Sequence, residues 1–201
     1  MSWIKEISYI DSEGKLRKLY NRVKGPDNNV DNVMSVHSLR PHSMEGHMAL
    51  YKNVLHHSAN SLPKHYLETI GIYVSHLNKC DYCVEHHFAG LTRLLRNTDR
   101  SEQIFKAVKA GAFDETFDTK ERQGLRYAAK LTMKLDQICK EDIDLLREHG
   151  FSDGEILELN QVASYFNYVN RMVVGLGVDT AGDILGLSPN NSDDPESWNH
   201  D

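Results

Sequence analysis

Hydrophobic residues recur at helical spacing along nearly the whole chain, with polar residues between them. Near the start, apolar positions 16, 19, 20 and 23 form one helix face, and Asp11 or Ser12 is the candidate cap before it. The turn-rich GPDNNVDN, residues 25–32, ends this helix. The pattern then predicts two helices divided at Pro41, with helical structure continuing to about His57.

Helix-terminus signals divide the remaining residues. Ser61 and Pro63 open a helix predicted to run to about position 77, and the next helix begins at Cys80 or Asp81. Further helices are predicted over residues 101–110, 119–135, 142–149 and 153–174. No strand-like alternation persists long enough to build a sheet, so we predict an all-α fold.

The helices form one predicted domain over residues 1–187. Its N-terminal helices occupy residues 1–58, and a core over residues 59–187 carries a pair of closely spaced cysteines. The last stretch, residues 188–201, is polar, acidic and interrupted by proline. Such a composition buries little apolar surface, so we predict a disordered acidic tail.

Composition narrows the classes of function. With 201 residues, 40% hydrophobic and 26% charged, the chain is typical of a globular protein. A net charge of −6 gives no general attraction to nucleic acid or to anionic membranes, so neither is expected as a partner. The chain has no apolar run of roughly 18 residues and no secretion signal at its start, and we expect a cytoplasmic protein.

The segment KCDYCVEHH, residues 79–87, holds two of the three cysteines. A cysteine reacts as the thiolate, and a helix N-terminus favours that anion. Cys80 and Cys83 stand three residues apart at a predicted helix start, so both sulfurs are expected on one face and close enough for a disulfide. In a cytosolic protein such a disulfide is usually transient and catalytic.

Two further residues stand at spacings suited to proton transfer. His87 follows Cys83 by one helical turn, on the same face. Glu68 precedes Cys80 by twelve residues, and a helical hairpin turning at 78–79 would return its carboxylate to the cysteines. His86 is rotated by about 100° from that face, which favours a surface or interface position.

Two other interpretations of the cysteines stay open, a metal site and an inert or structural pair. Cys80, Cys83 and His87 could bind zinc with Glu68 or His86 as fourth ligand, although zinc sites often join two paired motifs. Ordinary polar or capping roles are predicted for the histidines at 37, 42, 47, 56, 57, 65 and 76. Cys139 is expected to be a small buried or half-buried thiol, and Phe166, Val169 and Val173 are expected in the core.

The pattern of Glu68, Cys80-Asp81-Tyr82-Cys83 and His87 resembles AhpD-like alkylhydroperoxidases of the carboxymuconolactone decarboxylase superfamily. The segments NVMSVHSLRPHSMEGHMALY and SYFNYVNRMVVGLGV resemble its longer, peroxidase-related branch, and the likeness covers about residues 10–187. It implies an AhpD-like helical bundle with the CxxC at a helix N-terminus. It also implies a homo-oligomer, commonly a trimer or hexamer, with no prosthetic group.

The resemblance further implies a thiol-dependent peroxidase. Cys83 would attack the hydroperoxide, Cys80 would resolve the sulfenic acid as a disulfide, and Glu68 and His87 would carry the proton relay. An external dithiol or thiol protein would then restore the pair. Tyr82 is a difference, because characterised peroxidases of the family can carry a histidine there, and tyrosine with a pKa near 10 is a poor proton shuttle.

Three alternative functions are compatible with parts of the sequence. A dithiol–disulfide oxidoreductase would need the same helix-terminal cysteine pair, and a non-catalytic redox or metal-binding oligomer would use the cysteines to switch assembly or partner binding. Decarboxylation of a muconolactone-like acid is disfavoured, because superfamily members with that activity generally lack the paired cysteines.

Overall fold

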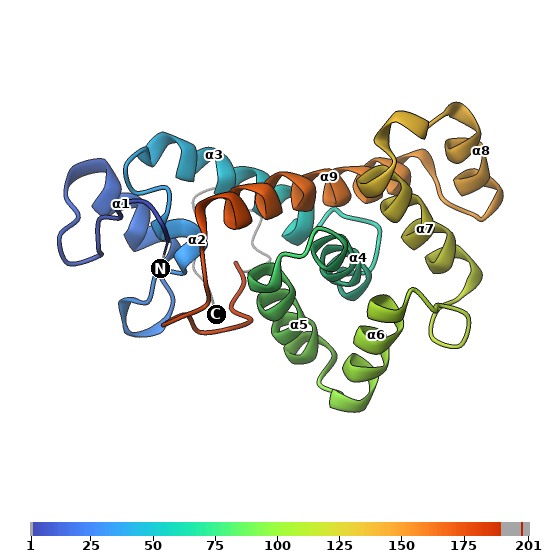
Figure 1. Ribbon diagram of the computed structural model, residues 1–201, viewed down its shortest axis with the longest axis horizontal. Coiled ribbons are helices and arrows are strands. Elements are labelled where there is room, and N and C mark those ends of the chain that lie inside the picture. Colours follow the sequence, from blue (N-terminus) through green and yellow to red (C-terminus); the bar gives the residue numbers. More distant parts are fainter. Residues whose placement is uncertain (1, 190–197, 199–201) are drawn as a thin grey trace.

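The computed structural model of the protein describes residues 2–189 and residue 198 (Figure 1). Its α-helices are α1 (Gly14–Val23), α2 (Asn32–Ser35), α3 (Pro41–Tyr51), α4 (Lys64–Leu77), α5 (Asp81–Leu95), α6 (Thr98–Ala110), α7 (Thr119–Met133), α8 (Lys140–Glu148) and α9 (Asp153–Leu176). Short helical turns of other types occupy Pro26–Asn28, Lys52–His56 and Leu135–Gln137. These residues contain no β-strand, and the predicted all-α fold is confirmed.

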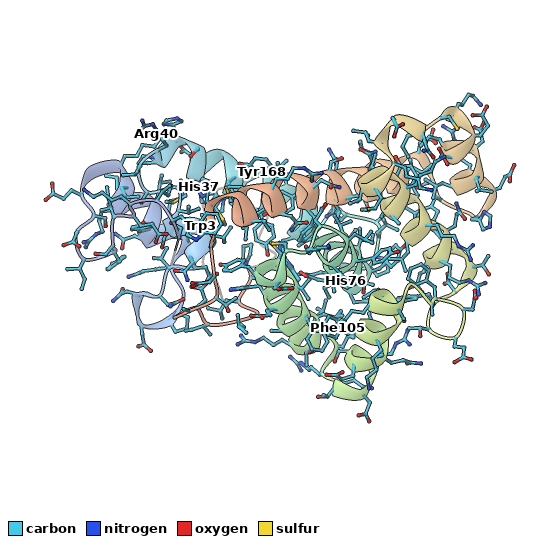
Figure 2. All side chains as sticks on the ribbon, in the orientation of Figure 1. Trp3, His37, Arg40, His76, Phe105 and Tyr168 are labelled. Carbon is cyan, nitrogen blue, oxygen red and sulfur yellow. The ribbon has the colours of Figure 1, made fainter. Side chains whose placement is uncertain are left out.

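Helices α4 and α5 form a hairpin at the centre of the molecule, and the long helix α9 packs against α4 (Figure 1). On one side of this centre lie α1 to α3, and on the other lie α7 and α8. Side chains fill the space between the central helices (Figure 2). Ile70 and Val74 of α4 and Leu159 and Phe166 of α9 have no exposed surface, so the core of the bundle lies where these two helices meet.

The helix starts were predicted closely where a strong signal was present. Helix α4 ends at Leu77 as expected, and Cys80 is the N-cap of α5. Helices α7 and α9 begin at residues 119 and 153 as predicted, each with a capping box, formed by Asp118 with Glu121 and by Ser152 with Glu155. These caps satisfy backbone N–H groups that have no partner inside the helix.

Two helix starts were predicted wrongly. Helix α1 begins at Gly14 after Glu13, because the hydroxyl of Ser12 donates to the Tyr9 carbonyl instead of capping the helix. Helix α6 begins at Thr98, three residues before the predicted start. Its cap is Asn97, whose side-chain oxygen accepts the Arg100 N–H at 3.0 Å.

The last described residues turn back from α9 onto α5. We call residues 178–189 the C-terminal strap. It touches α5 so closely that a Cβ added at Gly186, which has φ +80°, would lie 2.7 Å from the Ala89 carbonyl carbon. The predicted disordered tail, residues 188–201, falls mostly outside the described residues; within it, the ring of Trp198 lies 3.6 Å from the Arg22 guanidinium. No helix in the described part of the chain has the length and apolar character to cross a membrane.

A substitution at Gly71 tests the contact between α4 and α9. A Cβ at Gly71 would lie 2.3 Å from ring carbons of Phe166, so Gly71→Ala must displace a fully buried side chain. We expect a loss of about 1–3 kcal/mol in the free energy of unfolding, measured by urea denaturation. Gly46→Ala is the control, because nothing lies within 4 Å of its added Cβ; equal stability changes in the two variants would contradict this packing.

Candidate functional site

The paired cysteines stand at the turn between α4 and α5. Lys79 has φ +57°, an uncommon backbone conformation that reverses the chain sharply after α4. The Asn78 side chain ties this turn to α9 by donating to Asn170 Oδ1 at 3.0 Å. Cys80 then caps α5 and Cys83 is its third residue, so both cysteines lie at the helix N-terminus as predicted.

The two thiols are in direct contact. Both are free and buried, with 1% of Cys80 and 3% of Cys83 exposed. Their sulfur atoms share a hydrogen bond at 2.9 Å. Only a small movement therefore separates this pair from a disulfide.

The contact makes the two thiols unequal acids. The hydrogen bond with Cys83 lowers the pKa of the Cys80 thiol. Burial raises the pKa of the Cys83 thiol well above its usual value, and the bond to Cys80 raises it further. Cys83 needs a base to become a thiolate.

Glu68 and His87 form a hydrogen-bonded pair beside Cys83. The hairpin of α4 and α5 brings the Glu68 Oε2 atom to 2.7 Å from the His87 Nδ1 atom. Only 4% of the Glu68 side chain and 14% of the His87 side chain are exposed. With Nδ1–H donated to the carboxylate, Nε2 is the ring nitrogen that can take up a proton. The structure thus brings these two residues together as the helical spacing predicts.

Cys83, Glu68 and His87 line one cavity of about 50 Å³. Its walls come from α3, α4, α5, α9, the residues around the start of α2, and the C-terminal strap. Aromatic rings form much of the wall: Tyr51 and Tyr165 stack with ring centroids 5.4 Å apart, and Tyr51 meets the His87 ring edge-on at 6.1 Å. The cavity is therefore small and partly aromatic.

A second polar cluster borders the cavity and is centred on Asp183 of the strap. Its Oδ2 atom accepts the Tyr82 hydroxyl at 2.7 Å and lies 3.1 Å from His86 Nε2. The same carboxylate accepts the Asn32 N–H at 3.0 Å, while the Val33 N–H donates to the Tyr82 oxygen. Burial raises the pKa of Tyr82 well above its usual value. Tyr82 thus anchors the strap and the α2 segment, and a proton-shuttle role does not fit it.

Two sequence-based expectations about single residues are wrong. His86 is 8% exposed and lines the cavity, because the strap covers the face on which a surface position was expected. His47 also lines the cavity, where its Nε2 atom lies 3.5 Å from the Tyr165 hydroxyl, which fits the ordinary polar role expected of it. Cys139 is exposed and caps α8, where its sulfur lies 3.4 Å from Asp142 Oδ2.

The alternative metal site is not assembled. Within residues 2–189 and residue 198, no group of three or more cysteine, histidine or acidic side chains is arranged to hold a metal ion. Cys80 and Cys83 share a hydrogen bond with each other, and His87 shares one with Glu68.

Comparison with known proteins agrees with the family that the residues of the site resemble. Residues 41–130 match the carboxymuconolactone decarboxylase family. A comparison with curated proteins gives no significant match. The matched segment contains all four residues predicted to be catalytic, Glu68, Cys80, Cys83 and His87.

Solved structures share the fold over most of the chain. An uncharacterised peroxidase-related protein from Silicibacter sp. TM1040 is 27% identical over 76% of this chain and 80% of its own, with a TM-score of 0.66. A peroxidase-related protein with an alkylhydroperoxidase AhpD core, from Ralstonia eutropha JMP134, is 21% identical over 89% and 92%, with a TM-score of 0.74. A debrominase in complex with 2,3,4-tribromopyrrole is 16% identical over 89% and 90%, with a TM-score of 0.66.

The family match and the fold agree. The matched segment holds the cysteine pair and spans α3 to α6 and most of α7, and the likeness to the peroxidase-related structures extends over the flanking helices. Residues 41–130 thus match the carboxymuconolactone decarboxylase family, and the chain is similar in fold to AhpD-like, peroxidase-related proteins over most of its length.

Proposed function

We propose that the protein is a thiol-dependent peroxidase that reduces small hydroperoxides through Cys83 and Cys80. One observation carries the proposal: Cys83 shares a buried cavity with a hydrogen-bonded glutamate–histidine pair and its sulfur touches a second thiol. A base, a nucleophile and a resolving thiol are the three parts that such a reaction needs.

The first step oxidises Cys83. Glu68 holds the His87 ring, whose Nε2 takes the proton from the Cys83 thiol. The thiolate then attacks the distal oxygen of the hydroperoxide. A sulfur–oxygen bond forms as the oxygen–oxygen bond breaks, Cys83 becomes a sulfenic acid, and the leaving alkoxide takes a proton to become an alcohol.

The second step closes the disulfide. Cys80 suits the role of resolving thiol, because its pKa is lowered and its sulfur lies 2.9 Å from that of Cys83. Its thiolate attacks the sulfenic sulfur, the sulfur–sulfur bond forms, and hydroxide leaves and is protonated to water. An external dithiol then reduces the disulfide by thiol–disulfide exchange. Assembly as a trimer or hexamer stays part of the proposal and can be measured by light scattering.

The size of the cavity limits the substrate. A volume of about 50 Å³ holds a few water-sized groups. Hydrogen peroxide and short alkyl hydroperoxides fit such a space, whereas a bulky aryl hydroperoxide needs the walls to open. We therefore expect a higher kcat/KM for hydrogen peroxide than for cumene hydroperoxide.

The test of the function is dihydrolipoamide-dependent reduction of hydrogen peroxide by the wild type and by Glu68→Gln. The neutral amide cannot stabilise the positive charge that the His87 ring gains when it takes the thiol proton. We therefore expect a fall of about 100-fold in kcat/KM. Glu148→Gln is the control, because Glu148 is exposed at the end of α8. Absence of turnover in the fully reduced wild type would exclude the proposed function.

The aromatic wall favours a second candidate, reductive removal of a halogen from a halogenated aromatic ring. Tyr51, Tyr165 and the His87 ring could stack against such a substrate. Two thiols would supply two electrons, so that the carbon–halogen bond becomes carbon–hydrogen, halide leaves and the pair ends as a disulfide. The small cavity makes this candidate the weaker one, and halide release from tribromopyrrole would identify it.

A further inference from the structure

A buried carboxyl group without a role in the mechanism above lies in the wall of the Cys83 cavity. Asp31 is 9% exposed and stands at the N-cap position of α2. An aspartate there ordinarily accepts a hydrogen bond from an amide of the first helical turn. The Asp31 side chain makes no such bond: the Val33 N–H donates to the Tyr82 hydroxyl oxygen and the Met34 N–H donates to the Asp31 backbone carbonyl. The Asp31 carboxyl group therefore does not cap the helix, and it lies in the wall of the cavity.

The surroundings of Asp31 suit a proton donor. Burial raises the pKa of its carboxyl group to about 7, with the His86 ring lowering it and the Asp183 carboxylate raising it. Tyr82 of α5 and Tyr51 of α3 are the other titratable groups within its electrostatic reach. Near neutral pH a large share of Asp31 is therefore protonated.

We propose that Asp31 is a general acid that donates a proton to the leaving oxygen of the hydroperoxide when Cys83 attacks. This inference rests on the peroxidase function proposed above. Asp31 suits the role better than His86, because His86 Nε2 is held by Asp183 at 3.1 Å.

The division of roles balances every proton. His87 takes the thiol proton, the sulfur–oxygen bond forms, the oxygen–oxygen bond breaks, and the alkoxide or hydroxide receives the Asp31 proton. Cys83 is oxidised by two electrons and the peroxide is reduced by two. Asp31 ends the step as a carboxylate, and the proton on His87 replaces the one that it lost. A base and an acid on separate walls can act at the same moment.

The test compares two oxidants that differ in their leaving group. Hydrogen peroxide expels hydroxide, a strong base that needs a proton, whereas peracetic acid expels acetate, which does not. Single-turnover loss of the Cys80 and Cys83 thiols is followed with each oxidant in a Cys139→Ser background, which removes the exposed thiol. Asp31→Asn is compared with the wild-type residue and with Asp27→Asn, a control at an exposed position of the same segment.

We expect Asp31→Asn to slow oxidation by hydrogen peroxide about 100-fold and to leave oxidation by peracetic acid nearly unchanged. The wild-type rate with hydrogen peroxide should also fall relative to the variant as pH rises above about 7. An equal effect of Asp31→Asn on both oxidants, or no effect, would overturn this inference and leave the peroxidase standing. Oxidation of the wild-type pair by hydrogen peroxide no faster than that of glutathione would overturn both.

Discussion

Cys83→Ser is expected to abolish hydroperoxide turnover, with kcat falling by more than about 1,000-fold. A serine hydroxyl at this buried position is far harder to ionise than a thiol and cannot form a sulfenic acid. The nearby base and the cavity would remain, but the atom that accepts the peroxide oxygen would be absent. The measurement is steady-state reduction of hydrogen peroxide with dihydrolipoamide as the electron donor.

Two other cysteine variants make this result specific. Cys80→Ser should react once, because Cys83 can still form the sulfenic acid, and then stop without a resolving thiol. Cys139→Ser should keep the wild-type rate, since Cys139 caps α8 away from the cavity. Turnover preserved in Cys83→Ser but lost in Cys80→Ser would reverse the assignment of attacking and resolving thiols.

Asp31→Asn is expected to raise the stability of the protein at pH 8 and to leave it nearly unchanged at pH 4. The pKa of Asp31 is raised from 3.8 to about 7 in the folded protein, so the folded state holds the proton more tightly than the unfolded state. The stability linked to this proton is fully present below pH 4 and is lost as pH rises toward 7. The loss amounts to about 4 kcal/mol in the wild type, and asparagine, which does not ionise, avoids it.

Urea denaturation of both proteins between pH 4 and pH 8 measures this difference. Titrating groups that do not interact with Asp31 contribute equally to both curves, so the difference between the curves reports Asp31 and its immediate electrostatic neighbours. Asp27→Asn should track the wild type at every pH, because Asp27 is exposed. Parallel curves for Asp31→Asn and wild type would mean that Asp31 is ionised in the folded protein throughout this range. A carboxyl group retained at such a cost is consistent with a functional role.

The placement of the cysteine pair and of the glutamate–histidine pair could be predicted from the sequence because their geometry is local. Cys80, Cys83 and His87 share one face of one helix, and Glu68 returns to them through a single hairpin. The relative positions of these four side chains therefore follow from helical periodicity. The acidity of Cys83 could not be predicted in the same way, because it depends on how much of the surrounding protein excludes water.

The second polar cluster, centred on Asp183, could not be predicted from the sequence pattern. Asp183 reaches Asn32 across 151 positions and Tyr82 across 101, and neither contact follows from spacing along a helix. Asp31 looks like an ordinary cap residue before a short helix, and only the structure shows that the Val33 amide bonds to Tyr82 and leaves the Asp31 side chain without a capping bond. The rotation predicted for His86 holds, but the strap that buries its face belongs to a distant segment.

The residues that line the cavity come from two parts of the chain, the segment that matches the family and the segments on either side of it. The thiols, the glutamate and the histidine all lie inside the family segment 41–130, whereas Asp31, Tyr165 and the strap residue Leu187 lie outside it. Substitutions at Tyr165 and in the strap can therefore reshape what enters the cavity while the cysteines and the glutamate–histidine pair stay unchanged. For protein engineering, this makes the strap and the cavity-facing side of α9 the natural sites for changing substrate range.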